Sequence, residues 1–361
     1  MSDGRGLAKH GPFGRGSRRV LVIGGRGYFG RLLIEDLLRH TDCDLVVASR
    51  RQFRSKEFNT VVADLWDASS LERALTDVTV AICAAGPFQT LPTTLAELCL
   101  KRGIHYIDLA DDRGFVQKVY DLARRQGNSV SAVCSGWSTV PALSGLLAGI
   151  ASSGMRTVES IQIQMAPGNR GARRTGTIAS LMHSVGQPFT ICRNGRFERV
   201  LGWSEPRDFV FPPPVGKRRG YLIDVPDHEI FPALFSARTV EFRAGSELQI
   251  LNGCISLLCR TKRNWVSWSG LLRRAMGLLS WIGHDWGGIG VEVSGDITRR
   301  AYLTAESRAE RIAVMPASVM TAAFLCGVEN PGVNSYNGWL TEHELRVECE
   351  RRGFQFVVER A

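Results

Sequence analysis

The 361-residue sequence lacks the features that mark several classes of protein. It has no uncharged apolar run of about 18 residues, the length that a membrane-spanning helix needs. Its nine cysteines are scattered without a C-x-x-C pair, so we expect no disulfide framework and no metal site. The N-terminal residues lack the apolar core of a secretory signal. These absences favour a globular protein of the reducing cytoplasm.

The formal net charge is +10, but no nucleic-acid-reading signature accompanies it. Several basic residues lie in a Gly- and Arg-rich stretch, residues 1–19, which we predict to be a disordered basic arm. The remaining positive charge is typical of a solvated surface with sites for anionic small molecules. We therefore expect a small-molecule substrate and no nucleic-acid partner.

A glycine cluster follows the first buried apolar segment. Residues 20–23 predict a strand, residues 25–30 have the spacing G-x-G-x-x-G, and a helix-periodic stretch follows. Strand, glycine turn and helix in this order are typical of dinucleotide binding, because the glycines let the backbone approach a pyrophosphate at the helix N-terminus. The alternative is an ordinary glycine-rich turn between a strand and a helix.

Apolar segments and helix-periodic segments alternate through residue 151. The expected strands are 20–23, 44–49, 59–64, 78–86, 104–111 and 129–136. Strands that are apolar on both faces and alternate with helices predict an α/β fold, a doubly wound parallel sheet of the Rossmann type over 20–151. Its ligand should lie at the carboxyl ends of the strands.

The end of the second expected strand favours NADP over NAD. An NAD site usually places a carboxylate there, whereas this chain has Ser49, Arg50 and Arg51. Arginine can bind a 2′-phosphate bidentately, and a carboxylate would repel it. The alternative is a solvated turn. Asp64, which ends the third strand, is a candidate for the adenine side or a turn residue.

The turn after the fourth strand carries Ala85, Gly86 and Pro87 and has no long side chain. Its place on the sheet makes it a candidate to pass over the diphosphate and the nicotinamide ribose. The alternative is a plain turn before the next helix.

Four segments in this order resemble the saccharopine dehydrogenase-like family of NAD(P) oxidoreductases: GGRGYFG, ADLWDASSLERAL, VAICAAGPF and CLKRGIHYIDLADD. Segments 135–149, 174–186 and 227–248 extend the resemblance. It implies a Rossmann domain followed by an α/β substrate domain that often mediates dimerisation, so we expect a homodimer. It also implies cofactor contacts by Gly25, Gly27, Tyr28, Phe29, Gly30 and the 85–88 turn.

The second half has longer alternating segments and a hairpin signal at Asn194-Gly195. These features predict a substrate or dimerisation domain over 152–310, built on a mixed or antiparallel sheet. Residues 311–361 predict a helix and then a helix–strand tail. By resemblance to the family, this tail packs back on the nucleotide domain.

Candidate residues for the chemistry follow the strands or lie in the second domain. Asp112 is the candidate proton donor, with a helix cap as its alternative role. Four further residues are candidates for substrate contact: Ser138, Arg174, Thr175 and His183. Arg174, and Thr175 at a helix N-terminus, could hold a carboxylate. The alternative for His183 is a residue of the packed interior or of the surface. The alternative for Arg174 is a place in a solvated basic loop.

Residues 265–286 place Trp265, Trp268 and Leu272 on one helical face and basic residues away from it. Core-facing helices, subunit contacts and membrane-surface helices are all built in this way.

The sequence thus predicts an NADP-dependent oxidoreductase that transfers hydride to or from an imine, carbonyl or unsaturated substrate. The alternatives are a non-catalytic NADP-binding sensor or scaffold and a membrane-surface enoyl or lipid reductase.

Overall fold

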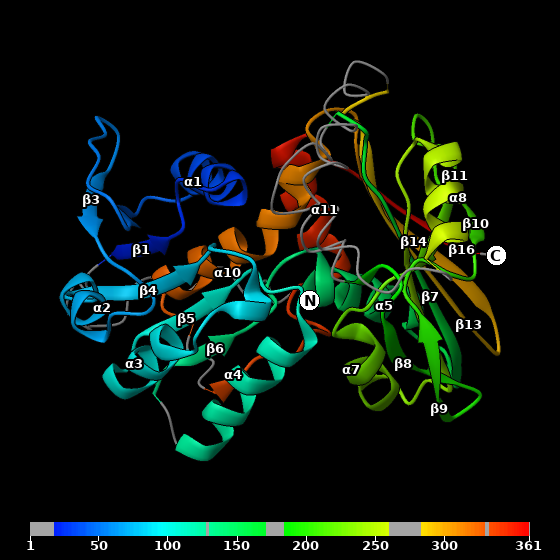
Figure 1. Ribbon diagram of the computed structural model, residues 1–361, viewed down its shortest axis with the longest axis horizontal. Helices are drawn as coiled ribbons and strands as arrows, with labels where there is room; N and C mark the ends of the chain where they lie inside the picture. Colours follow the sequence, from blue (N-terminus) through cyan, green and yellow to red (C-terminus); the bar gives the residue numbers. More distant parts are fainter. Residues whose placement is uncertain (1–17, 128–129, 171–183, 260–282, 329–331, 361) are drawn as a thin grey trace, which may run out of the picture.

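The computed structural model describes residues 18–127, 130–170, 184–259, 283–328 and 332–360. They form two β-sheets with helices packed around them (Figure 1). Arg174, Thr175, His183 and most of the segment 265–286 lie outside the described residues, as do residues 1–17 of the predicted arm.

The first sheet is parallel throughout, with the strand order β15-β6-β5-β4-β1-β2-β3. Its strands are β1 (Arg19–Ile23), β2 (Asp44–Ser49), β3 (Asn59–Val62), β4 (Val78–Cys83), β5 (His105–Asp108), β6 (Ala132–Cys134) and β15 (Gly332–Val333). Its helices are α1 (Tyr28–His40), α2 (Ala68–Ala74), α3 (Thr94–Arg102), α4 (Arg113–Gln126) and α10 (Met315–Leu325). This arrangement confirms the predicted doubly wound parallel sheet.

Helices cover both faces of this sheet, which explains why its central strands are apolar on both sides. Helices α1 and α10 contact one another, and α2, α3 and α4 contact in series (Figure 1). Val20, Leu21 and Val22 of β1 are fully buried between these layers. The edge β1–β2–β3 differs, because residues 50–58 connect β2 to β3 without a helix.

The second sheet has the order β10-β11-β12-β7-β13-β14-β16, and the β8–β9 hairpin joins it at β12. Strand β12 runs parallel to β7 and the remaining pairs are antiparallel, which confirms a mixed sheet. The strands are β7 (Val158–Ala166), β8 (Pro188–Arg193), β9 (Arg196–Leu201), β10 (Arg207–Val210), β11 (Lys217–Leu222), β12 (Thr239–Ala244), β13 (Gly287–Gly295), β14 (Thr298–Ala305) and β16 (Gln355–Arg360). Its helices are α5 (Ser144–Ser152), α7 (Asp227–Leu234), α8 (Gln249–Leu258) and α11 (Glu342–Arg352).

The C-terminal tail divides between the two sheets. Helix α10 packs on the first sheet and β15 pairs with β6 at its edge. Strand β16 instead pairs with β14 of the second sheet. The expectation that residues 311–361 pack as a whole on the nucleotide domain is therefore wrong for this last strand. Its pairing partner lies about 50 residues earlier in the chain and is not encoded in the local pattern.

Candidate dinucleotide site

The turn between β1 and α1 allows an unusually close approach of backbone. Gly24 has φ +85°, and a Cβ atom there would lie 2.5 Å from the backbone nitrogen of Ala85. A Cβ atom on Gly30 would lie 2.3 Å from the carbonyl oxygen of Gly24. The turn therefore requires Gly24 as well as the predicted Gly30. Gly24 precedes the motif and was missed, although the double glycine after the strand is a signal for it.

The N-terminus of α1 is open to a ligand. Gly27 is its N-cap residue and is exposed, and its N–H donates to the carbonyl of Gly24 at 2.8 Å. Among the described residues, no side chain caps this helix, and its first turn contains no acid. Tyr28 and Phe29, which begin the helix, are half-buried, with ring centroids 5.3 Å apart. Free N–H groups and the positive end of the helix dipole suit a phosphate here.

The turn that follows β4 lies directly against this glycine turn. The N–H of Ala84 donates to the carbonyl of Ile23 at 2.8 Å, and Ala85 contacts Gly24. A Cβ atom placed on Gly86 would have no atom within 4 Å, so this residue borders open space. Pro87 is exposed beside it. The structure thus brings the 85–87 turn and the 24–30 turn together at the carboxyl edge of the sheet.

The predicted residues at the ends of β2 and β3 occupy turns. The hydroxyl of Ser49 donates to the carbonyl of Arg51, and Arg50 and Arg51 are both exposed. The carboxylate of Asp64 accepts the N–H of Trp66 at 3.1 Å. This hydrogen bond gives Asp64 a turn role, and its contact with the adenine side stays a prediction.

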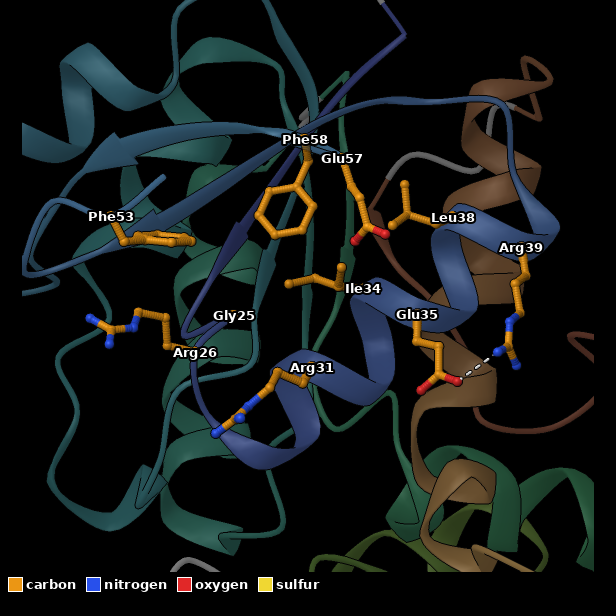
Figure 2. A pocket seen from close by; sticks show the side chains of 10 residues that line it. All are labelled: Gly25, Arg26, Arg31, Ile34, Glu35, Leu38, Arg39, Phe53, Glu57 and Phe58. Atoms are coloured by element: carbon orange, nitrogen blue, oxygen red, sulfur yellow. Dashed lines mark ion pairs between the residues drawn. The ribbon is translucent and has the colours of Figure 1, made fainter. Parts of the chain in front are cut away.

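A pocket of about 620 Å³ lies between α1 and the helix-free β2–β3 connection (Figure 2). It begins at the glycine turn and runs along the flank of α1. Its lining residues are Gly25, Arg26, Arg31, Ile34, Glu35, Leu38, Arg39, Phe53, Glu57 and Phe58. Because α1 lacks a neighbouring helix on this side, its flank stays uncovered beside its N-terminus.

Asp112, the predicted proton donor, is the N-cap of α4, since its carboxylate accepts the N–H of Phe115 at 2.8 Å. Its neighbour Arg113 reaches the second domain and donates to the carbonyl of Thr190 at 3.2 Å and to Asp224. Ser138, a predicted substrate contact, donates its hydroxyl to the carbonyl of Ala313 at 2.9 Å. Asp112 therefore has a structural role that explains its presence.

A buried carboxylate at the end of β5 organises the strand ends. Asp108 ends β5, and its carboxylate accepts the N–H groups of Ala110 at 2.9 Å and Gly136 at 2.8 Å. Burial raises the pKa of Asp108 from 3.8 to about 6, against the effect of these hydrogen bonds. Asp108 thus fixes the two loops that follow β5 and β6. An acid within an otherwise apolar strand is the sequence signal for it.

Two titratable residues of the second domain are fully buried where α5, α7 and β12 meet. The carboxylate of Asp227 accepts the hydroxyl of Ser144, and burial raises its pKa from 3.8 to about 7. The neighbouring His228 accepts the N–H of Phe242 at 2.9 Å on Nε2. Burial lowers the pKa of His228 well below 6.5, so the ring is neutral and acts as an acceptor.

The described part of the chain lacks two features. It contains no group of three or more His, Cys, Asp or Glu residues that could hold a metal ion. None of its helices is both long enough and apolar enough to span a bilayer.

A parallel sheet whose carboxyl edge carries an uncapped, glycine-lined helix N-terminus defines a doubly wound dinucleotide-binding protein. Residues 20–133 match the family described as saccharopine dehydrogenase NADP binding domain. The first domain is therefore of the type found in the saccharopine dehydrogenase-like NAD(P)-binding family, as the sequence motifs indicated. It is of an NADP-binding type found in oxidoreductases.

A solved structure shares the fold at low sequence identity, and two others match with lower TM-scores. Apo saccharopine dehydrogenase (L-Glu forming) from Saccharomyces cerevisiae is 13% identical with a TM-score of 0.66, over 95% of this chain and 99% of the yeast chain. GenD2 from gentamicin A biosynthesis, in complex with NAD, is 13% identical with a TM-score of 0.42, over 99% and 100% of the two chains. The dehydrogenase MviM from Clostridium difficile is 9% identical with a TM-score of 0.39, over 92% and 97%. No curated protein sequence matches.

Proposed function

We propose that the protein is an NADP-dependent oxidoreductase that transfers hydride to or from an imine, carbonyl or unsaturated substrate. The observation that carries this proposal is the open N-terminus of α1, lined by Gly24, Gly27 and Gly30 at the carboxyl edge of the sheet. The glycines let the pyrophosphate approach, and backbone N–H groups in the first turn of α1 would hold it. The bound cofactor supplies the hydride, and the protein binds and orients its two substrates.

The preference for NADP rests on two observations. The matched family is an NADP-binding domain. The tail of β2 offers Ser49, Arg50 and Arg51 and no carboxylate that would repel a 2′-phosphate. We therefore expect NADPH to bind at least tenfold more tightly than NADH.

The space bordered by Gly86 suits the nicotinamide half of the cofactor. It lies on the side of β5 and β6, where Asp108 holds both following loops in place. Arg113 joins this edge to the second domain through Thr190 and Asp224. A substrate held between the nucleotide edge and the second domain would meet the cofactor there.

Nucleotide titration followed by a turnover assay tests the proposal. NADPH and NADH are titrated by calorimetry, and deuterium transfer from 4-deuterated NADPH is then measured with a panel of imino acids, ketones and enoyl compounds. Transfer to one class supports the oxidoreductase. Tight NADPH binding with no transfer across the panel would favour the alternative of a non-catalytic sensor or scaffold.

A membrane-surface location is a second candidate, favoured by α8. Ile250 and Leu257 are 87% and 71% exposed, and Cys254 between them is exposed at helical spacing. The next 23 residues in the sequence, 260–282, include five basic and no acidic residues. Apolar side chains beside positive charge suit an anionic membrane. Ile250→Glu with Leu257→Glu should then abolish co-sedimentation with phosphatidylserine vesicles, and wild type that fails to sediment would contradict the idea.

Self-association is also proposed, on the family resemblance alone. Analytical ultracentrifugation should give twice the chain mass of 39.8 kDa. A single species at the monomer mass would contradict it.

A further inference from the structure

The pocket beside α1 exists because the β2–β3 connection has no helix. In a doubly wound sheet the crossover between neighbouring parallel strands usually contains one. Here residues 50–58 bridge β2 and β3 alone, and Phe53 and Phe58 from this connection face Ile34 of α1 across the pocket (Figure 2). The result is a space next to the glycine turn, on the side toward β2, whose walls combine apolar and charged side chains, Glu35 and Glu57 among them.

The position and shape of the pocket suit the adenosine end of a dinucleotide. The pyrophosphate of such a cofactor lies at the N-terminus of the first helix, and the adenosine extends toward the end of β2. The pocket begins at Gly25 and Arg26, directly before that N-terminus, and includes the ring of Phe53. Its volume of about 620 Å³ exceeds the space that a nucleoside requires.

Arg26 differs from the other cations that line this pocket. Arg39 pairs with Glu35 at 2.9 Å, and Arg31 donates weakly to the carbonyl of Gly27 at 3.4 Å. Arg26 is exposed, and within the described ranges no carboxylate lies at ion-pair distance from it. Its guanidinium lies 5.5 Å from the centroid of the Phe53 ring, below the ring in Figure 2. A guanidinium held by a cation–π contact alone can transfer to a stronger anionic partner at little cost.

We propose that Arg26 binds the 2′-phosphate of NADP(H), with Phe53 as the apolar wall of the adenosine pocket. This inference rests on the proposed function and assigns its cofactor discrimination to a residue inside the glycine motif. Sequence reasoning placed that task on Arg50 and Arg51, which do not line the pocket. The planar guanidinium offers two parallel N–H groups to phosphate oxygens and a flat face to adenine.

Binding of adenosine 2′,5′-bisphosphate and of AMP to the full chain tests the proposal without turnover. Wild type should bind the bisphosphate at least tenfold more tightly than AMP. Arg26→Gln should bring the two affinities within about twofold of one another by weakening the bisphosphate alone. Phe53→Ala should weaken both ligands by a similar factor. Arg54→Gln is the matched control, because Arg54 is exposed in the same connection and does not line the pocket.

The outcomes separate this inference from the proposed function. Discrimination that persists in Arg26→Gln, or that is lost in Arg50→Gln instead, overturns the role of Arg26 and leaves the oxidoreductase standing. Discrimination that depends on Arg26 without hydride transfer to any substrate supports the inference and contradicts the oxidoreductase. Wild type that binds neither ligand overturns both. Circular dichroism checks that each variant keeps the fold.

Discussion

Arg352 and Asp36 form a buried ion pair that ties the two sheets together. Nη2 and Nε of Arg352 lie 2.8 and 3.1 Å from Oδ2 of Asp36, and the side chains are 1% and 3% exposed. Asp36 belongs to α1 of the nucleotide domain, whereas Arg352 ends α11, directly before β16 of the second sheet. The pair therefore fixes the first helix of one layer against the last helix of the other.

Removal of either charge should destabilise the protein strongly. Arg352→Ala leaves Asp36 buried without its partner, which costs about 3–5 kcal/mol in comparable buried pairs. Arg352→Lys keeps the charge but loses the bidentate geometry, so its free energy of unfolding should fall less than that of Arg352→Ala. Urea unfolding measures both. The control is Arg124→Ala, which removes a solvent-exposed pair with Asp121 and should cost less than about 1 kcal/mol. Equal losses for the two alanine variants would contradict the role of the buried pair.

Asp112 offers a direct test of a proton donor against a helix cap. Asparagine caps helices as well as aspartate does but cannot donate a catalytic proton. If Asp112 serves only as the cap of α4, Asp112→Asn keeps both stability and kcat, and Asp112→Ala loses about 1 kcal/mol of stability. We expect this result. A fall in kcat of about 100-fold or more in Asp112→Asn, with unchanged melting, would restore the sequence prediction.

The buried carboxyl of Asp227 should make stability fall as pH rises. Its pKa is raised from 3.8 to about 7, so between these values the folded state keeps a proton that the unfolded state has lost. The free energy of unfolding then decreases with pH in this window, by up to about 1.4 kcal/mol per pH unit. Asp227→Asn keeps an acceptor for Ser144 and removes the titration. Urea midpoints at pH 5 and pH 8 should therefore differ less in Asp227→Asn than in wild type, and identical differences would contradict the argument.

The nucleotide-binding half could be predicted because its signals are local. Strand β1, the glycine turn and α1 follow one another within 22 residues, and each has its own periodicity or turn chemistry. The same is true of the alternation through β6. By contrast, β15 has two residues and pairs with a strand 200 positions earlier, so no local pattern encodes it. Strand β16 likewise pairs with a strand that is distant in the sequence, β14.

The sequence indicates candidate site residues where backbone conformation determines them, but not where tertiary contact brings residues together. Gly27 and Gly30 are required by the turn itself, so spacing finds them. Arg26 occupies a variable position of the motif, and only the fold brings Phe53 to it from a connection 27 residues away. For Asp112 the sequence left two roles open, because an acid at a strand end and an acid at a helix N-cap have the same sequence signature.

Gly30 and Gly86 should respond to substitution in opposite ways. A Cβ atom on Gly30 meets the backbone of the glycine turn at 2.3 Å, whereas one on Gly86 meets nothing within 4 Å. Gly30→Ala should therefore lower the melting temperature, because helix α1 must move away from β1. Gly86→Leu should keep the melting temperature and project its side chain into the space that the cofactor needs, which lowers NADPH affinity by tenfold or more. Differential scanning fluorimetry and NADPH titration measure the two effects. A folded Gly86→Leu variant that binds NADPH as wild type does would show that the cofactor does not pass this turn.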